Sequence, residues 1–103
     1  MSDINVNQPQ TASLTFYGDV GAQDFLDWIA HRANKLGLVG WVKGHDLGQS
    51  VEVLVSGSVD LIDAMELGCS LGPESIWVET INRQVHNNYA PLESGFKIIN
   101  SSN

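Results

Sequence analysis

The sequence has little of what stabilises secreted proteins or attaches a protein to nucleic acid or a membrane. Its one cysteine, Cys69, excludes an internal disulfide framework and a thiolate zinc site within the 103 residues. Five basic residues against twelve acidic ones leave a formal charge of −7, which opposes binding to nucleic-acid phosphates and to anionic membrane surfaces. No hydrophobic run approaches the roughly 18 residues of a membrane-spanning helix.

The length and composition indicate a single globular domain. An apolar fraction of 43% is enough for one core, and 103 residues are too few for two independent domains. Residues 1–10 have neither a basic stretch nor an apolar one, so they do not resemble a signal peptide. We therefore expect a monomeric, cytoplasmic protein without a cofactor, with a disordered tail at 1–11, a domain at 12–100 and a short tail at 101–103.

The spacing of the apolar residues predicts seven elements. Leu14 and Phe16 share one face of a strand, and the apolar residues from Phe25 to Leu36 recur at helical spacing. Ser58 is a suitable N-cap for a second helix, which ends before Gly72. The predicted segments are a strand at 13–17, a helix at 23–36, a strand at 39–43, a turn at 44–48, a strand at 49–56, the second helix, a strand at 76–81, a loop at 86–91 and a short strand at 96–99.

This order of elements is typical of a ferredoxin-like α/β (α+β) sandwich, βαββαβ, with a short extra C-terminal strand. Two helices are expected to cover one face of a mostly antiparallel sheet. Because this fold hosts many activities, the order of elements does not by itself indicate a function.

Two segments carry a more specific signal, and together they resemble the acylphosphatase family. In that family the first segment reads Gly-x-Val-Gln-Gly-Val-x-Phe-Arg. The second reads Leu-Gly-Leu-x-Gly-Trp-Val-x-Asn, with a further glycine after three more residues. Residues 18–25 and 36–48 of this chain match these patterns at Gly18, Val20, Phe25, Leu36, Gly37, Leu38, Gly40, Trp41, Val42 and Gly48. The resemblance extends over about residues 13 to 99.

The resemblance implies metal-free hydrolysis of small acyl phosphates. The loop after the first strand would direct backbone N–H groups at the phosphate from a helix N-terminus. In this sequence that cradle loop is Gly18, Asp19, Val20, Gly21, Ala22 and Gln23. The family's arginine would clamp the phosphoryl oxygens, and its asparagine would orient the attacking water. The implied partner is a small anion or acyl phosphate.

The two catalytic positions are replaced in this chain. The arginine position falls on Leu26 and the asparagine position on Gly44, neither of which offers a hydrogen-bonding side chain. Loss of one preorganised donor typically lowers the rate by roughly 10²–10³. We therefore predict a pseudoenzyme, a binding or regulatory module of unknown ligand that holds anions weakly. Arg32 and Lys43 are not expected to substitute, because one lies about 9 Å along the helix from Leu26 and the other faces away from Gly44.

Two alternatives remain. The first is a weak acylphosphatase that uses the backbone amides of the cradle loop alone. The second is a cation site formed by Asp19, Asp24, His45 and Asp46, which are predicted to lie near the loop. We favour turn and helix-start roles for these four residues over a cation site, because aspartate is common at both positions and their spacing is not that of a known metal motif.

The sequence pattern also predicts which tryptophan and cysteine side chains are buried. Trp28 and Trp41 lie on apolar stripes and are expected in the core, as is Cys69 on the second helix. Trp77 alternates with Ile76 and Val78, so one side of its strand is expected to be less buried. An exposed tryptophan there would indicate a surface that contacts a partner.

Overall fold

The computed structural model describes residues 9–86 and 94–99, and its elements follow the predicted order. They are β1 (Gln10–Asp19), α1 (Gln23–Lys35), β2 (Val39–His45), a 3-10 turn (Asp46–Gly48), β3 (Ser50–Gly57), α2 (Val59–Leu71), β4 (Trp77–His86) and β5 (Phe96–Ile99). The Ser58 side chain accepts a hydrogen bond from the Leu61 N–H, as expected for the N-cap of α2.

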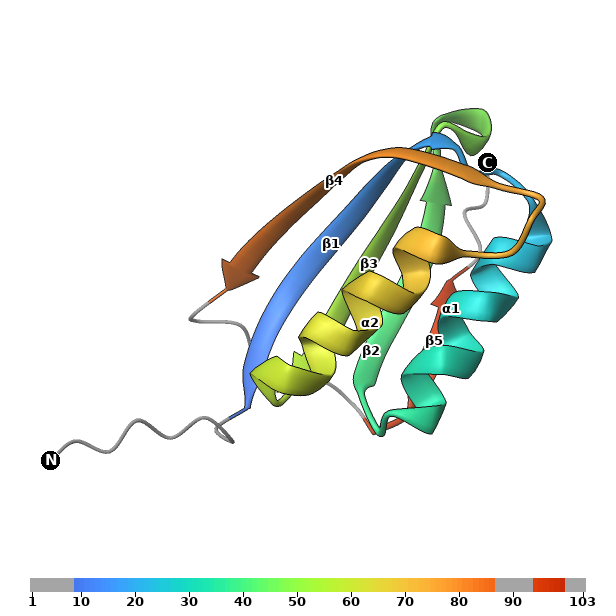
Figure 1. Cartoon of the computed structure of the whole chain (residues 1–103). Coiled ribbons are helices and arrows are strands. Elements are labelled where there is room, and N and C mark those ends of the chain that lie inside the picture. The colour runs from blue at the N-terminus through green and yellow to red at the C-terminus, as the bar shows by residue number, and fades with distance from the viewer. Residues whose placement is uncertain (1–8, 87–93, 100–103) are drawn as a thin grey trace, which may run out of the picture.

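The five strands form one sheet in the order β4-β1-β3-β2-β5. All neighbours are antiparallel except β2 and β5, which run parallel. Both helices lie across the same face of the sheet (Figure 1). The predicted ferredoxin-like sandwich is therefore confirmed, including its extra C-terminal strand. No helix in the described ranges is long and apolar enough to cross a membrane.

The core fills the space between the helices and the sheet. Alternate residues of β1 and β3 point into it, and α1 and α2 add their apolar stripes. Phe16 of β1 and Phe25 of α1 meet edge to face, with ring centroids 5.7 Å apart. The fully buried members with the largest side chains are Leu14, Phe16, Val20, Phe25, Ile29, Leu38, Val42, Val51, Val53, Val55, Ile62 and Met65. The contact between Phe16 and Phe25 fixes the start of α1 against the sheet.

Several strands are longer than the sequence predicted. β1 begins at Gln10, so residues 10 and 11 belong to the sheet and not to the tail. β2 continues through His45 into the region predicted as a turn, and the turn itself holds Leu47 at a φ of 53°, in the left-handed region. β4 reaches His86, which was predicted to lie in a loop. In each case pairing with a neighbouring strand extends an element whose own apolar alternation had ended. The rest of the predicted 86–91 loop, residues 1–8 and residues 100–103 lie outside the described ranges.

The prediction that Trp28 and Trp41 lie in the core was wrong for both residues. The Trp28 side chain is 37% exposed, and it packs along the contact between α1 and α2 instead of entering the core. Trp41 is only half-buried, because it alternates with the buried Val42 and so lies on the sheet face opposite the helices. Trp77 is 68% exposed at the start of β4, in line with the less buried side expected there.

Cys69 is buried in the core as predicted, and burial raises the pKa of its thiol from 9.0 to about 12, with the Arg32 charge opposing part of the rise. The unfolded chain therefore loses this proton near pH 9 while the folded chain keeps it. We expect the free energy of unfolding to fall by about 2 kcal/mol from this group between pH 8 and pH 10.5. Urea denaturation at both pH values measures the change.

Cys69→Ala is the control for that measurement, because tyrosine and lysine residues also titrate in the alkaline range. The loss of stability between the two pH values should be smaller in the variant than in the unmodified protein. An equal loss in both proteins would contradict the assignment to Cys69.

Candidate functional site

The loop between β1 and α1 packs directly on the turn between β2 and β3. The Gly18 N–H donates to the Gln49 carbonyl and the Val20 N–H to the Gly48 carbonyl, both at 3.1 Å. A Cβ atom added to Gly21 would lie 2.6 Å from the Gly48 Cα, so the two backbones meet at a distance that only glycine permits. Gly18 and Asp19 are themselves the last residues of β1. Two of the amides expected to face a ligand are thus already used to hold the loop.

Four consecutive backbone N–H groups at the end of this loop and the start of α1 find no acceptor in the described part of the chain. Those of Gly21, Ala22, Gln23 and Asp24 have no hydrogen-bond partner among the residues that the structure describes. Ala22 is the N-cap of α1 and makes no side-chain cap bond. The free amides therefore stand at the positive end of the helix dipole, an arrangement that favours an anion.

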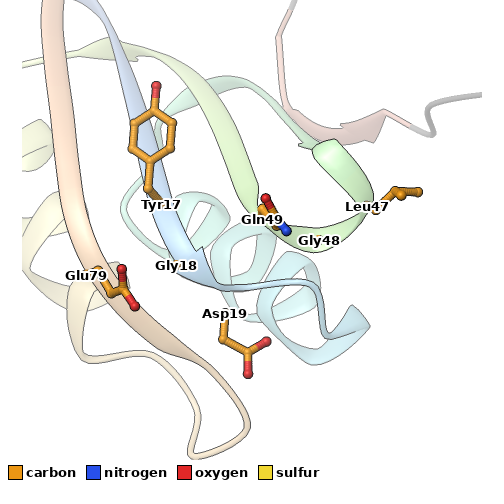
Figure 2. Close-up of a pocket in the computed structure, with 7 residues that line it drawn as sticks. All are labelled: Tyr17, Gly18, Asp19, Leu47, Gly48, Gln49 and Glu79. Carbon is orange, nitrogen blue, oxygen red and sulfur yellow. The ribbon is translucent and has the colours of Figure 1, made fainter.

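A pocket of about 640 Å³ opens beside the first part of this loop (Figure 2). Asp19 at the end of β1 and Glu79 of β4 contribute carboxylates to its wall, and no basic residue of the described ranges lines it. The full lining is Tyr17, Gly18, Asp19, Leu47, Gly48, Gln49 and Glu79. The pocket is therefore negatively charged. Gly48 in its wall packs on Gly21, but Leu26, Gly44 and residues 21–24 do not line it.

A β-bulge places Glu79 beside the site. Along the β1–β4 ladder Tyr17 pairs with Thr80 and Gly18 pairs with Val78, so Glu79 is the extra residue on β4. The bulge changes the alternation of the strand, and an acidic side chain comes to lie near the end of β1. Sequence reasoning missed Glu79 because a bulge leaves no periodic signal in a single strand.

Leu26 and Gly44 stand where the family resemblance implies an arginine and an asparagine. Leu26 is partly buried and packs against the hydrophobic core from the first turns of α1. Gly44 lies two residues after the buried Val42, so its missing side chain would point to the helix side of the sheet. A Cβ atom at Gly44 would meet nothing within 4 Å. Space for an asparagine is present, but the hydrogen-bonding group is absent.

None of the other basic side chains with a described contact takes over these positions. Arg32 lies over the Trp28 ring, far along α1 from the loop. Arg83 of β4 donates to Asp63 at 2.8 Å and to Glu66 at 3.0 Å on α2. Burial lowers the pKa of Arg83, but the hydrogen bonds and charges of these two carboxylates outweigh it and raise the pKa overall.

Three residues of the alternative cation site, Asp19, Asp24 and His45, do not form a group placed to hold a metal ion. Among the residues that the structure describes, no group of three or more histidine, cysteine, aspartate or glutamate side chains is placed to hold a metal ion. His45 instead lies with its Nε2 atom 3.0 Å from Oε1 of Glu52 on β3. Asp19 lines the pocket and Asp24 is exposed in the first turn of α1, while the Asp46 side chain is not described.

The fold and the β1–α1 loop define a ferredoxin-like α/β domain with free amides at the N-terminus of its first helix. The chain belongs to the acylphosphatase family, because the family model described as acylphosphatase matches residues 12–98. It is 34% identical over 68 residues to an acylphosphatase of Rhodopseudomonas palustris, which covers 66% of this chain and 68% of that protein. It is 31% identical over 88 residues to an acylphosphatase of Azorhizobium caulinodans, which covers 85% of this chain and 92% of that one.

A solved structure agrees with this assignment at the level of the fold. The crystal structure of acylphosphatase from Bacillus subtilis superposes with a TM-score of 0.80 at 23% identity. The superposition covers 87% of this chain and 98% of the other. The resemblance seen in segments 18–25 and 36–48 is therefore confirmed for the domain as a whole.

Proposed function

We propose that this chain is a binding module of the acylphosphatase family that does not hydrolyse acyl phosphates above the spontaneous rate. The observation that carries the proposal is the pair Leu26 and Gly44. The first is an aliphatic side chain packed against the core, and the second has an open space where a side chain would stand. Neither position can donate a hydrogen bond from a side chain to a phosphoryl oxygen or to an attacking water.

The expected loss of rate is large because both missing groups would act on the transition state. A preorganised donor near developing negative charge typically contributes roughly 10²–10³ in rate. An orienting group for the water contributes separately through proximity, although the two losses need not add. With both groups gone, the chain retains the fold and the backbone amides but little to stabilise the transferring phosphoryl group.

The electrostatics of the pocket support weak binding of anions. Asp19 and Glu79 stand in its wall without a lining cation, and the whole chain carries −7. The free amides of residues 21–24 favour an anion, but only with the partial charge of a helix end, about half an elementary charge. Two full negative charges nearby oppose this attraction, so we propose that small anions bind with low affinity.

Benzoyl phosphate hydrolysis by the purified protein tests the proposal. We expect no turnover above the buffer rate, because the groups that would stabilise the transition state are missing. The assay follows the loss of the acyl phosphate over a range of protein concentrations. A rate that rises in proportion to protein and saturates with substrate would overturn the proposal.

Such a rate would favour a second function, a weak acylphosphatase that relies on backbone amides. The four N–H groups of residues 21–24 are the observation in its favour, since each is free to donate to a phosphoryl oxygen. Gln23→Pro removes one of them at the first position of α1, where proline is well tolerated, and Ala22 already has the extended backbone that precedes proline. Gln23→Ala is the matched control. If the chain is a weak acylphosphatase, Gln23→Pro should lose the activity and Gln23→Ala should keep it.

A further inference from the structure

A further pocket, smaller than the one beside Asp19 and Glu79, lies at the C-terminal half of α1 and has a basic lining. Its volume is about 160 Å³, and it is lined by Trp28, His31, Arg32 and Lys35. Two of the five lysine and arginine residues of the chain therefore gather here, in a protein with twelve acidic residues. The charge of this pocket is opposite to that of the pocket beside Asp19 and Glu79.

The Arg32 guanidinium is held in place by contacts with Trp28 and Gly68. It lies over the Trp28 ring, with its central carbon 5.9 Å from the ring centroid. It also packs against Gly68 of α2, where an added Cβ atom would lie 2.7 Å from Arg32 Nε. The Trp28 indole N–H donates to the Gly68 carbonyl at 3.2 Å, which ties the ring to the same residue. This packing orders a long side chain before any ligand arrives.

Within residues 9–86 and 94–99, this ordered guanidinium has no acidic partner. No ion pair or hydrogen bond joins the side chains of Arg32 or Lys35 to a carboxylate in the described part of the chain, whereas Arg83 pairs with two. The C-terminus of a helix carries a partial negative charge of about half an elementary charge, which repels anions. Two full positive charges exceed that value, so the pocket is cationic overall. The planar fork of an arginine matches the oxygens of a carboxylate or a phosphate.

We propose that this pocket, formed by Trp28, His31, Arg32 and Lys35, binds a small oxyanion group, the carboxylate or phosphate of a larger molecule. Its volume is several times that of a water molecule but below that of sites that enclose a whole small-molecule ligand. Arg32 supplies the bidentate contact, Lys35 adds charge, and the exposed edge of Trp28 contacts the rest of the molecule. Eight residues separate Arg32 from Asp24, about 12 Å along α1, so the site is distinct from the free amides.

Titration of the isotope-labelled protein with inorganic phosphate, and separately with acetate, tests this site. Nuclear magnetic resonance follows the Arg32 side-chain N–H and the Trp28 indole N–H at constant ionic strength. We expect saturable shifts of both signals. Arg32→Gln should weaken the binding about tenfold or more, because a charge-assisted bidentate contact is lost. Lys43→Gln, which removes the same charge from β2, should leave the affinity within about twofold.

Gly68→Ala separates the proposal from a general effect of charge or of unfolding. Alanine favours the helix more than glycine does, so the fold should survive. Its Cβ atom would displace the guanidinium, and we expect the affinity to fall severalfold while the net charge is unchanged.

Saturable binding of phosphate, acetate or both that depends on Arg32 and Gly68 supports the site and identifies the oxyanion that it takes. No saturable shift with either probe would overturn it, as would equal affinity in the Arg32→Gln variant. Shifts confined to the amides of residues 21–24 would also overturn it, while leaving the function proposed for that loop intact.

Discussion

Replacement of Leu26 by arginine and Gly44 by asparagine in the same chain is expected to raise benzoyl phosphate hydrolysis at least about 100-fold over the unmodified protein. An arginine at position 26 can keep its aliphatic stem against the core that Leu26 covers now, and extend its charged head past it. An asparagine at position 44 enters open space on the helix side of the sheet. Both groups would then join the free amides of residues 21–24. The initial rate at saturating substrate measures the gain.

A matched control distinguishes a bidentate arginine contact with the phosphoryl oxygens from a simple change of charge. Leu26→Lys/Gly44→Asn has the same net charge as the arginine variant but lacks the planar fork that binds two phosphoryl oxygens at once. It should show a much smaller gain. Equal activity of the two double variants would mean that charge alone limits the rate. No activity in either would contradict the view that these two positions are what the chain lacks.

The fold was predictable because local and long-range signals agree along most of the chain. Leu14 and Phe16 alternate within β1, and Ser58 and Gly72 flank α2 in the structure as they do in the sequence pattern. The ends of β2 and β4 were missed, since their last residues join the sheet through pairing and not through their own apolar pattern. Trp28 was misplaced because an apolar stripe does not reveal that a neighbouring helix offers a carbonyl for its indole N–H.

The position of the loop between β1 and α1 was predictable from the sequence, but the arrangement of its amides was not. Motif spacing located the loop at residues 18–23, but it gave no indication that the Gly18 and Val20 amides are bound by the β2–β3 turn. Those bonds join segments about thirty residues apart, so only the folded chain shows them. Glu79 entered the pocket through a bulge that no residue type signals. The spacing of Trp28 and Arg32, four residues apart on one helix, could have indicated their contact.

Phe25→Ala is expected to lower the free energy of unfolding by about 3–5 kcal/mol, the usual cost of a large aromatic side chain lost from a core. Phe25 is fully buried and meets the Phe16 ring at an interplanar angle of 83°, so its removal leaves a cavity between α1 and β1. For a domain of this size the midpoint of thermal unfolding should drop by more than about 12 °C. Calorimetry or thermal denaturation followed by circular dichroism measures the change.

Leu71→Ala is the control for this substitution, because Leu71 is an exposed residue at the end of α2 and its loss should change stability by less than about 0.5 kcal/mol. A similar effect for the two variants would contradict the role given to Phe25.

The packing of Phe25 also affects the candidate site, since Phe25 directly follows the four free amides and its N–H donates to the Ala22 carbonyl at 3.0 Å. A cavity at Phe25 should therefore also loosen the free amides of residues 21–24. The shifts that phosphate induces in the resonance signals of these amides should be smaller in Phe25→Ala, even at temperatures where the variant is fully folded.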